Sequence, residues 1–156
     1  MLLQVKTPHG FTLIEMVSVV VLLSILGVVA MAKLGNFGGF GSKAFFDEVV
    51  TAVRHAQKLA VSTGCDVQLS LSATGYALHQ RATDCTTGAF TLDVVDPVNR
   101  GNAYQNANPD VAISPAPINL VFDAQSTVSG IAASQVFTVD GRPFTVFQNT
   151  GLVDAL

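Results

Sequence analysis

A long apolar segment near the N-terminus constrains this 156-residue chain more than any other feature. Met16 to Ala32 contains no charged residue, and the longer segment from Phe11 to Ala32 contains only Glu15. As a helix rising about 1.5 Å per residue, the longer segment would span roughly 33 Å, against about 30 Å for the hydrocarbon core of a bilayer. The sequence therefore predicts a membrane-length helix. An ionisable residue inside such a helix is expected to have a function and a partner.

Two simple interpretations of this segment leave Glu15 unexplained. A secretory signal peptide would use Lys6 as its basic region and Ala30-Met31-Ala32 as an A-x-A cleavage site, and it would release a soluble periplasmic protein. A plain membrane anchor would keep the segment instead. In both cases a carboxylate near the start of the apolar core costs on the order of 2–3 kcal/mol on insertion scales.

A third interpretation explains the charge and rests on the string Gly10-Phe11-Thr12-Leu13-Ile14-Glu15. This string resembles the class III signal of type IV pilins and pseudopilins. The resemblance implies that a prepilin peptidase cleaves after Gly10 on the cytoplasmic side and that the new N-terminal residue, Phe11, is N-methylated. The apolar helix is then kept, first as a single-pass inner-membrane anchor with the C-terminal domain in the periplasm. Later it forms part of the core of a pilus or pseudopilus.

The role predicted for Glu15 is to set the register between filament subunits. In a shared apolar core its carboxylate would lie near the methylated amine of Phe11, from a neighbouring or the same subunit. A buried carboxylate and a buried ammonium are poorly tolerated alone and much better tolerated as a pair. A subunit docked at the wrong height would leave both charges unmet.

A glycine-rich stretch follows the apolar segment. Its four glycines predict a kink or melted segment that lets the anchor reorient. The alternative is interfacial packing by Phe37 and Phe40. The predicted organisation is a prepilin leader (1–10), a transmembrane and filament-core helix (11–34), a glycine-rich hinge (35–42) and a periplasmic globular pilin domain (43–156).

The globular part begins with a helix and continues with strands. Lys43 to Thr63 has apolar residues recurring at i+3 and i+4, which predicts an amphipathic helix, and Gly64 can end it. Beyond Gly64 the pattern alternates, and residues 96–117 are mostly loop. Strands are predicted at 67–71, 76–80, 89–95, 119–122, 135–139 and 144–148, with short ones at 111–113 and 152–153.

This order of elements predicts an α+β fold. A long N-terminal helix, membrane-spanning in its first half and amphipathic in its second, would pack on an antiparallel β-sheet. The arrangement resembles the type IV pilin fold, and its details are most similar to the pseudopilin H and FimT-like minor subunits.

Two cysteines, Cys65 and Cys85, allow only one pairing. In an exported chain a disulfide is expected, with a stabilisation of roughly 3 kcal/mol in the chain-entropy model. The alternative is two buried free thiols.

Charge argues against nucleic-acid binding. From residue 43 onward the chain has six Lys and Arg against ten Asp and Glu, and Arg142 is the only basic residue after Arg100. A nucleic-acid-binding domain needs a basic footprint. No nucleic-acid partner is therefore expected.

Catalytic and metal sites are not predicted either. The three histidines have neither metal-ligand spacing nor a neighbouring nucleophile, and the glycine-rich stretch lacks the Lys-Ser/Thr of a phosphate loop. Hard oxygen ligands occur in one loop, but their spacing is not that of an EF-hand and a solvated loop is the expected state. We expect no metal, no cofactor and no enzymatic activity. The three histidines are His9, His55 and His79, and the loop residues with oxygen ligands are Asp93, Asp96, Asn99, Asn102 and Asp110.

The resemblance and the cysteine pair together suggest a minor pilin of a mannose-sensitive haemagglutinin (MSHA) type pilus that takes part in assembly or tip formation. Its expected partners are the prepilin peptidase, the major and other minor pilins, the inner-membrane assembly platform and the inner membrane. One alternative is a minor pseudopilin of a type II secretion system. Another is a soluble periplasmic protein released by signal peptidase. The sequence does not separate the first two.

Overall fold

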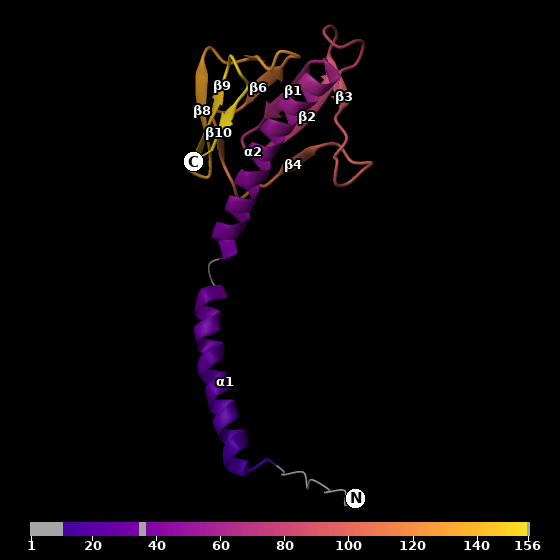
Figure 1. The fold of residues 1–156 in the computed structure, drawn as a ribbon. Coiled ribbons are helices and arrows are strands. Elements are labelled where there is room, and N and C mark those ends of the chain that lie inside the picture. The colour runs from indigo at the N-terminus through magenta and orange to yellow at the C-terminus, as the bar shows by residue number, and fades with distance from the viewer. Residues whose placement is uncertain (1–10, 35–36, 156) are drawn as a thin grey trace, which may run out of the picture. The chain divides into compact units, whose positions relative to one another are not determined.

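The computed structural model describes residues 11–34 and 37–155 (Figure 1). The predicted leader, residues 1–10, lies outside this part of the chain. The chain divides into two compact units, residues 1–38 and 39–156, and each is described by itself.

The main described element of the first unit is helix α1 (Leu13–Leu34). From Phe11 to Val28 every residue is exposed, and the large apolar side chains range from 46% exposed at Val19 to 82% at Leu13. A helix that is apolar on all sides is normally covered by other apolar material. Among the residues whose side chains the structure describes, no helix combines the length and hydropathy needed to cross a bilayer. The predicted membrane span therefore stays a prediction.

The second helix, α2 (Phe37–Thr63), begins earlier than predicted. The prediction of a melted segment is wrong for residues 37–42, which are helical. Each glycine costs about 1 kcal/mol of helix propensity, but extending an existing helix adds one hydrogen bond per residue and needs no new nucleus. The next turns are anchored by Phe45 and Phe46, which are 3% and 8% exposed. The hinge function assigned to residues 35–42 stays a prediction.

The amphipathic pattern predicted for α2 is confirmed. The apolar positions at i+3 and i+4 are all buried, and the helix ends at Thr63 as expected. Gly64 has a φ of 70° and its N–H donates to the carbonyl of Ala60 at 2.9 Å, which satisfies one of the last helical carbonyls. The buried positions are Phe46, Val49, Val53, Ala56 and Ala60.

The strands form two antiparallel sheets. In the larger one the order is β3-β2-β1-β6-β7. Strand β4 also pairs with β2, on the same edge as β3: β3 pairs with residues 79–81 of β2 and β4 with residues 75–77. The smaller sheet has the order β10-β9-β8-β5. The larger sheet contains β1 (Val67–Leu71), β2 (Gly75–Arg81), β3 (Phe90–Asp93), β4 (Gln105–Ala107), β6 (Ile118–Phe122) and β7 (Val128–Ser129). The smaller contains β5 (Ile113–Ser114), β8 (Ser134–Val139), β9 (Arg142–Phe147) and β10 (Val153–Asp154).

Helix α2 packs on both sheets through neighbouring phenylalanines. Phe45 meets Tyr76 of β2 with ring centroids 6.3 Å apart, and Phe46 meets Phe144 of β9 at 6.1 Å. In Figure 1 the larger sheet's β2 and β3 flank α2 on one side, and β8 and β9 flank it on the other. One core therefore unites the helix and both sheets, and the α+β fold predicted from the sequence is confirmed.

Most predicted strands are present, but two short strands were missed. The first hairpin has the predicted pairing, with Leu69 opposite Leu78. Strand β4 lies in the segment predicted to be mostly loop. Its three residues are all exposed and polar or small, so it has no alternating apolar pattern to detect. Strand β7 has only two residues, too few to show a period.

Candidate processing and assembly site

The start of α1 is capped by Thr12, the second residue of the predicted mature chain. Its Oγ1 accepts a hydrogen bond from the N–H of Glu15 at 3.3 Å, and its carbonyl accepts from the N–H groups of Glu15 and Met16 at 3.1 and 3.2 Å. Thr12 and Glu15 have the spacing of a capping box, in which a Ser or Thr cap is followed three residues later by Glu. The T-x-x-E pattern of residues 12–15 is the sequence signal for this cap, and Thr12 was not among the predicted site residues.

Glu15 lies in the first turn of α1, where the helix dipole favours a negative charge. The two serines of the same helix satisfy their hydroxyls internally: Ser18 donates to the carbonyl of Glu15 at 2.8 Å, and Ser24 to that of Val20 at 2.7 Å. Within the described residues the Glu15 carboxylate makes neither a hydrogen bond nor an ion pair. An apolar environment would therefore demand an external partner for Glu15 and not for the serines.

Of the two residues predicted to flank the cleaved bond, the structure describes one. Phe11 precedes the cap and is 79% exposed. Gly10 lies outside the described residues. The cleavage, the methylation of Phe11 and the register role of Glu15 stay predictions.

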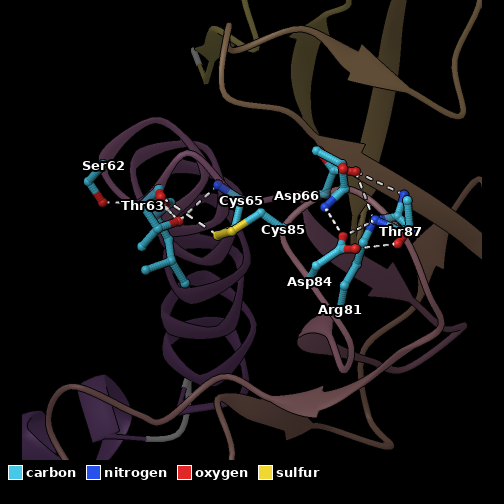
Figure 2. The surroundings of a disulfide bond; sticks show 10 residues. Ser62, Thr63, Cys65, Asp66, Arg81, Asp84, Cys85 and Thr87 are labelled. Carbon is cyan, nitrogen blue, oxygen red and sulfur yellow. Dashed lines mark hydrogen bonds and ion pairs between the residues drawn. A yellow bond between two sulfur atoms is a disulfide. The ribbon is translucent and has the colours of Figure 1, made fainter.

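The structure pairs Cys65 with Cys85 in a disulfide, as predicted (Figure 2). Cys65 follows the end of α2, and Cys85 lies in the loop after β2, so the bridge joins the helix to the larger sheet. Next to it the N–H of Asp66 donates to the carbonyl of Cys85 at 2.8 Å. The alternative of free thiols is excluded for this structure.

An arginine that the sequence analysis did not identify organises the disulfide loop. The Nε of Arg81 donates to Oδ2 of Asp66 at 2.8 Å, and its Nη1 donates to the carbonyl of Gly88 at 2.6 Å. Its guanidinium also lies over the ring of Phe90, 4.3 Å from the centroid. Figure 2 shows Arg81 and Asp66 beside the bridge. No sequence motif marks these contacts, because Asp66 reaches Arg81 only when β1 and β2 pair, and Phe90 reaches it only when β2 and β3 pair.

The same loop contains a turn held by Asp84. Its carboxylate accepts from the N–H groups of Thr86 and Thr87 at 2.9 and 2.6 Å and from the Thr87 hydroxyl at 2.6 Å. These hydrogen bonds, with the Thr87 hydroxyl first, hold the pKa of Asp84 below its usual value. The loop that carries Cys85 is therefore ordered by polar contacts on both sides of the bridge.

A second polar cluster joins α2 to the larger sheet. The Tyr76 hydroxyl donates to Oε1 of Glu48 at 2.7 Å, and Asn106 Nδ2 donates to both Glu48 oxygens at 2.9 and 3.0 Å. Burial, followed by the bond to Glu48, raises the pKa of Tyr76. Nearby, the His55 ring lies 4.9 Å from that of Tyr104. Burial lowers the pKa of His55, and Asp96 partly opposes the shift.

In the segment predicted to contain hard oxygen ligands, residues 93–110, carboxylates already make contacts within the protein. Asp96 accepts from the N–H of Val98 at 2.8 Å and from Nδ2 of Asn99 at 3.3 Å. Asp93 lies 3.4 Å from Nε2 of His79. Over residues 11–34 and 37–155, no group of three or more His, Cys, Asp or Glu side chains is placed to hold a metal ion. The absence of metal and cofactor stays a prediction.

Comparison with known proteins addresses the N-terminal segment directly. Residues 6–31 match the family described as the prokaryotic N-terminal methylation motif. No curated protein matches the chain significantly. Two crystal structures of the type IV minor pilin FimU from Pseudomonas aeruginosa (strain PAO1) are similar to it, at 15% and 14% identity and TM-scores of 0.49 and 0.47. The similarity covers 70% of this chain in both cases, and 88% and 84% of the FimU chains.

The motif match confirms the resemblance found in the sequence. It covers the predicted cleavage site, Glu15 and most of α1, and the helix leads into the α+β domain expected of a pilin. Pilin-type subunits are structural proteins rather than enzymes. The chain thus carries a prokaryotic N-terminal methylation motif at residues 6–31, and an α+β domain follows it.

Proposed function

We propose that this chain is a minor pilin, cleaved after Gly10 by a prepilin peptidase, methylated at Phe11 and incorporated into a type IV pilus. One observation supports the proposal above the others. The methylation motif spans residues 6–31 and covers most of α1, whose side chains from Leu13 to Val28 are exposed and mainly apolar, and the Glu15 carboxylate has no partner among the described residues. A subunit with this helix needs a bilayer before assembly and a shared helical core afterwards.

In this proposal residues 1–10 are the leader and residues 11–34 form the single inner-membrane span. Residues 35–42 act as a hinge, and residues 43–156 form the periplasmic domain. Cleavage creates a new amine one residue before the Thr12 cap. In the filament the Glu15 carboxylate pairs with such an amine, since neither charge is stable alone in an apolar core. The partners are the prepilin peptidase, the major and other minor pilins and the inner-membrane assembly platform.

Among type IV pili, we propose an MSHA-type pilus, in which the chain takes part in assembly or tip formation. The Cys65–Cys85 disulfide supports export to an oxidising compartment, which every such pilus requires. The second candidate is a minor pseudopilin of a type II secretion system, because the methylation motif serves both kinds of filament. Gene neighbourhood separates them. A major pilin and a pilus ATPase beside this gene support the first, and secretin and secretion-core genes support the second.

N-terminal sequencing and mass analysis of the protein from host membranes test the processing step. A mature chain that starts at methylated Phe11 supports the proposal, whereas a chain that starts at Lys33 overturns it in favour of signal-peptidase release. Gly10→Leu should leave the leader attached, because the peptidase acts after a glycine. Gln4→Leu, a leader substitution away from the cleaved bond, is the matched control and should be processed normally.

A further inference from the structure

A groove of about 560 Å³ runs between α2 and the C-terminal strands of the globular unit. Its floor is apolar and includes Phe46 and Val50, both under 9% exposed. Its rim is charged. Lys43, Asp47 and Arg54 are spaced by four and seven residues and so lie on one face of the helix, and Arg142 faces them from the start of β9. We call this site the basic groove.

The cations of the basic groove are not neutralised within the described chain. The ion pairs present there are His79 with Asp93 and Arg81 with Asp66, and neither involves the groove. The groove therefore has three positive side chains against one carboxylate. Outside it, the other residues from 43 onward contribute three basic and nine acidic side chains. Positive charge is thus concentrated in one recess of an otherwise acidic domain.

We propose that the basic groove binds a carboxylate-bearing segment of a neighbouring subunit in the filament, an inference that rests on the proposed function. Arginine binds carboxylates in a fork geometry, and Arg54 and Arg142 supply two such groups on opposite walls. A neighbour with an acidic surface like that of this chain would be complementary in charge, which favours correct pairing and faster encounter. The apolar floor gives the bound segment a non-polar contact, as in the centre of protein interfaces.

Chain connectivity keeps the groove within reach of adjacent subunits. Lys43 follows Leu34, the last residue of α1, by only nine residues, a distance of at most about 30 Å for a fully extended chain. Asp47 between the cations would weaken binding of a phosphate headgroup or a nucleic-acid backbone, whereas a protein segment can satisfy it with a hydrogen-bond donor.

Photo-crosslinking in the native host, on the full-length chain, tests the inference. A photoreactive amino acid replaces Thr51, an exposed residue of the groove lining. We expect crosslinks to a pilin-type subunit within a peptide that contains Asp or Glu. The double variant Arg54→Glu/Arg142→Glu should reduce this product at least tenfold, whereas Arg54→Lys/Arg142→Lys should keep most of it. Lys58→Glu, an exposed charge reversal on the same helix, is the matched control and should leave it unchanged.

Several results would overturn the inference. These are crosslinks only to lipid or nucleic acid, no crosslink to any pilin-type subunit, or equal crosslinking by the charge-reversed variant. Formation of the Cys65–Cys85 disulfide in each variant shows that the domain has folded. If the charge-reversed variant lacks this disulfide, the substitutions are made in the partner subunit instead. Asp or Glu residues in the crosslinked peptide are changed to Lys, and unchanged crosslinking overturns the inference. Normal processing to Phe11 without groove-dependent crosslinking removes the groove's role and leaves the proposed function intact.

Discussion

Arg81 and Asp66 form a two-point ion pair. Both Nε and Nη2 of the arginine lie 2.8 Å from Oδ2 of the aspartate, and the two side chains are only 20% and 16% exposed. Asp66 follows Cys65 directly, so the pair connects β2 to the residue beside the disulfide. We therefore expect the stability of this end of the domain to depend on both the ion pair and the adjacent disulfide.

Arg81→Ala should destabilise the globular unit by about 2–4 kcal/mol, because it leaves Asp66 without its partner and the Gly88 carbonyl without its donor. Arg81→Lys should recover only part of the loss, since an ammonium cannot reproduce the fork or the stacking on Phe90. Chemical unfolding of the detergent-solubilised chain measures both. Arg100→Ala, an exposed arginine outside any ion pair of the described residues, should change the stability by less than about 0.5 kcal/mol. An equal loss in the two alanine variants would contradict the assignment.

Removing the disulfide with Cys65→Ser/Cys85→Ser should cost about 3 kcal/mol, the chain-entropy value for cysteines separated by 20 residues. The unfolding midpoint of the wild type should fall on addition of a reductant to that of the double variant. The midpoint of the variant itself should not respond to the reductant. If the reductant left the unfolding midpoint of the wild type unchanged, the disulfide would contribute little to stability.

Gly130→Ala should be strongly destabilising, whereas Gly64→Ala should be mild. Both glycines have positive φ, 102° and 70°, so each alanine pays a backbone penalty of roughly 1–2 kcal/mol. At Gly130 a Cβ would also clash with the backbone oxygen of Asn119, but at Gly64 it would meet nothing within 4 Å. We expect Gly130→Ala to cost at least about 2 kcal/mol more, measured by thermal or chemical unfolding. Similar costs would show that the loop around Gly130 yields easily.

Tyr76 should make the globular unit lose stability at alkaline pH. The pKa of Tyr76 is raised by burial and by its bond to Glu48, so the folded state keeps a proton that the unfolded state loses above about pH 10. The folded state then binds more protons, and stability falls as pH rises above this value. Tyr76→Phe should flatten the fall in unfolding free energy between about pH 9 and 11.

Tyr104 is the comparison for this experiment, because the chain has only two tyrosines. Burial also raises its pKa, but the structure shows no hydrogen bond from its hydroxyl to a carboxylate among the described residues. Tyr104→Phe should therefore reduce the fall in unfolding free energy at alkaline pH less than Tyr76→Phe does. The reverse order would contradict the role given to Glu48.

Glu15→Ala should leave membrane insertion and cleavage intact and reduce incorporation into filaments at least tenfold. Glu15→Gln should also fail, because the amide lacks the charge that balances an amine in the core. The measurement compares the protein in sheared filaments with that in membranes. Thr12→Ala tests the cap separately. It should cost about 1 kcal/mol of helix stability and affect incorporation less. Normal incorporation of Glu15→Ala would remove the register role.

The sequence alone determined the elements that depend on local pattern. The period of α2 predicted its buried face, and Gly64 predicted its end, because an amphipathic stripe and a C-terminal glycine act within a few residues of the chain. Alternation located the hairpin of β1 and β2. The class III signal predicted the methylation motif that residues 6–31 match. The extension of α2 to Phe37 was not predictable from glycine content, since the propensity cost is outweighed by a helix already anchored at Phe45 and Phe46.

Only the tertiary structure decided how distant residues meet. Residue spacing does not bring Glu48 to Tyr76 and Asn106, which lie 28 and 58 residues away in the sequence. These contacts form when paired strands and a packed helix fix side chains far apart in sequence. The basic groove likewise needs Arg142 to face a helix some ninety residues earlier in the chain. The N-terminal motif, by contrast, is contiguous and is read as a linear string, and for that reason it could be identified before any fold was known.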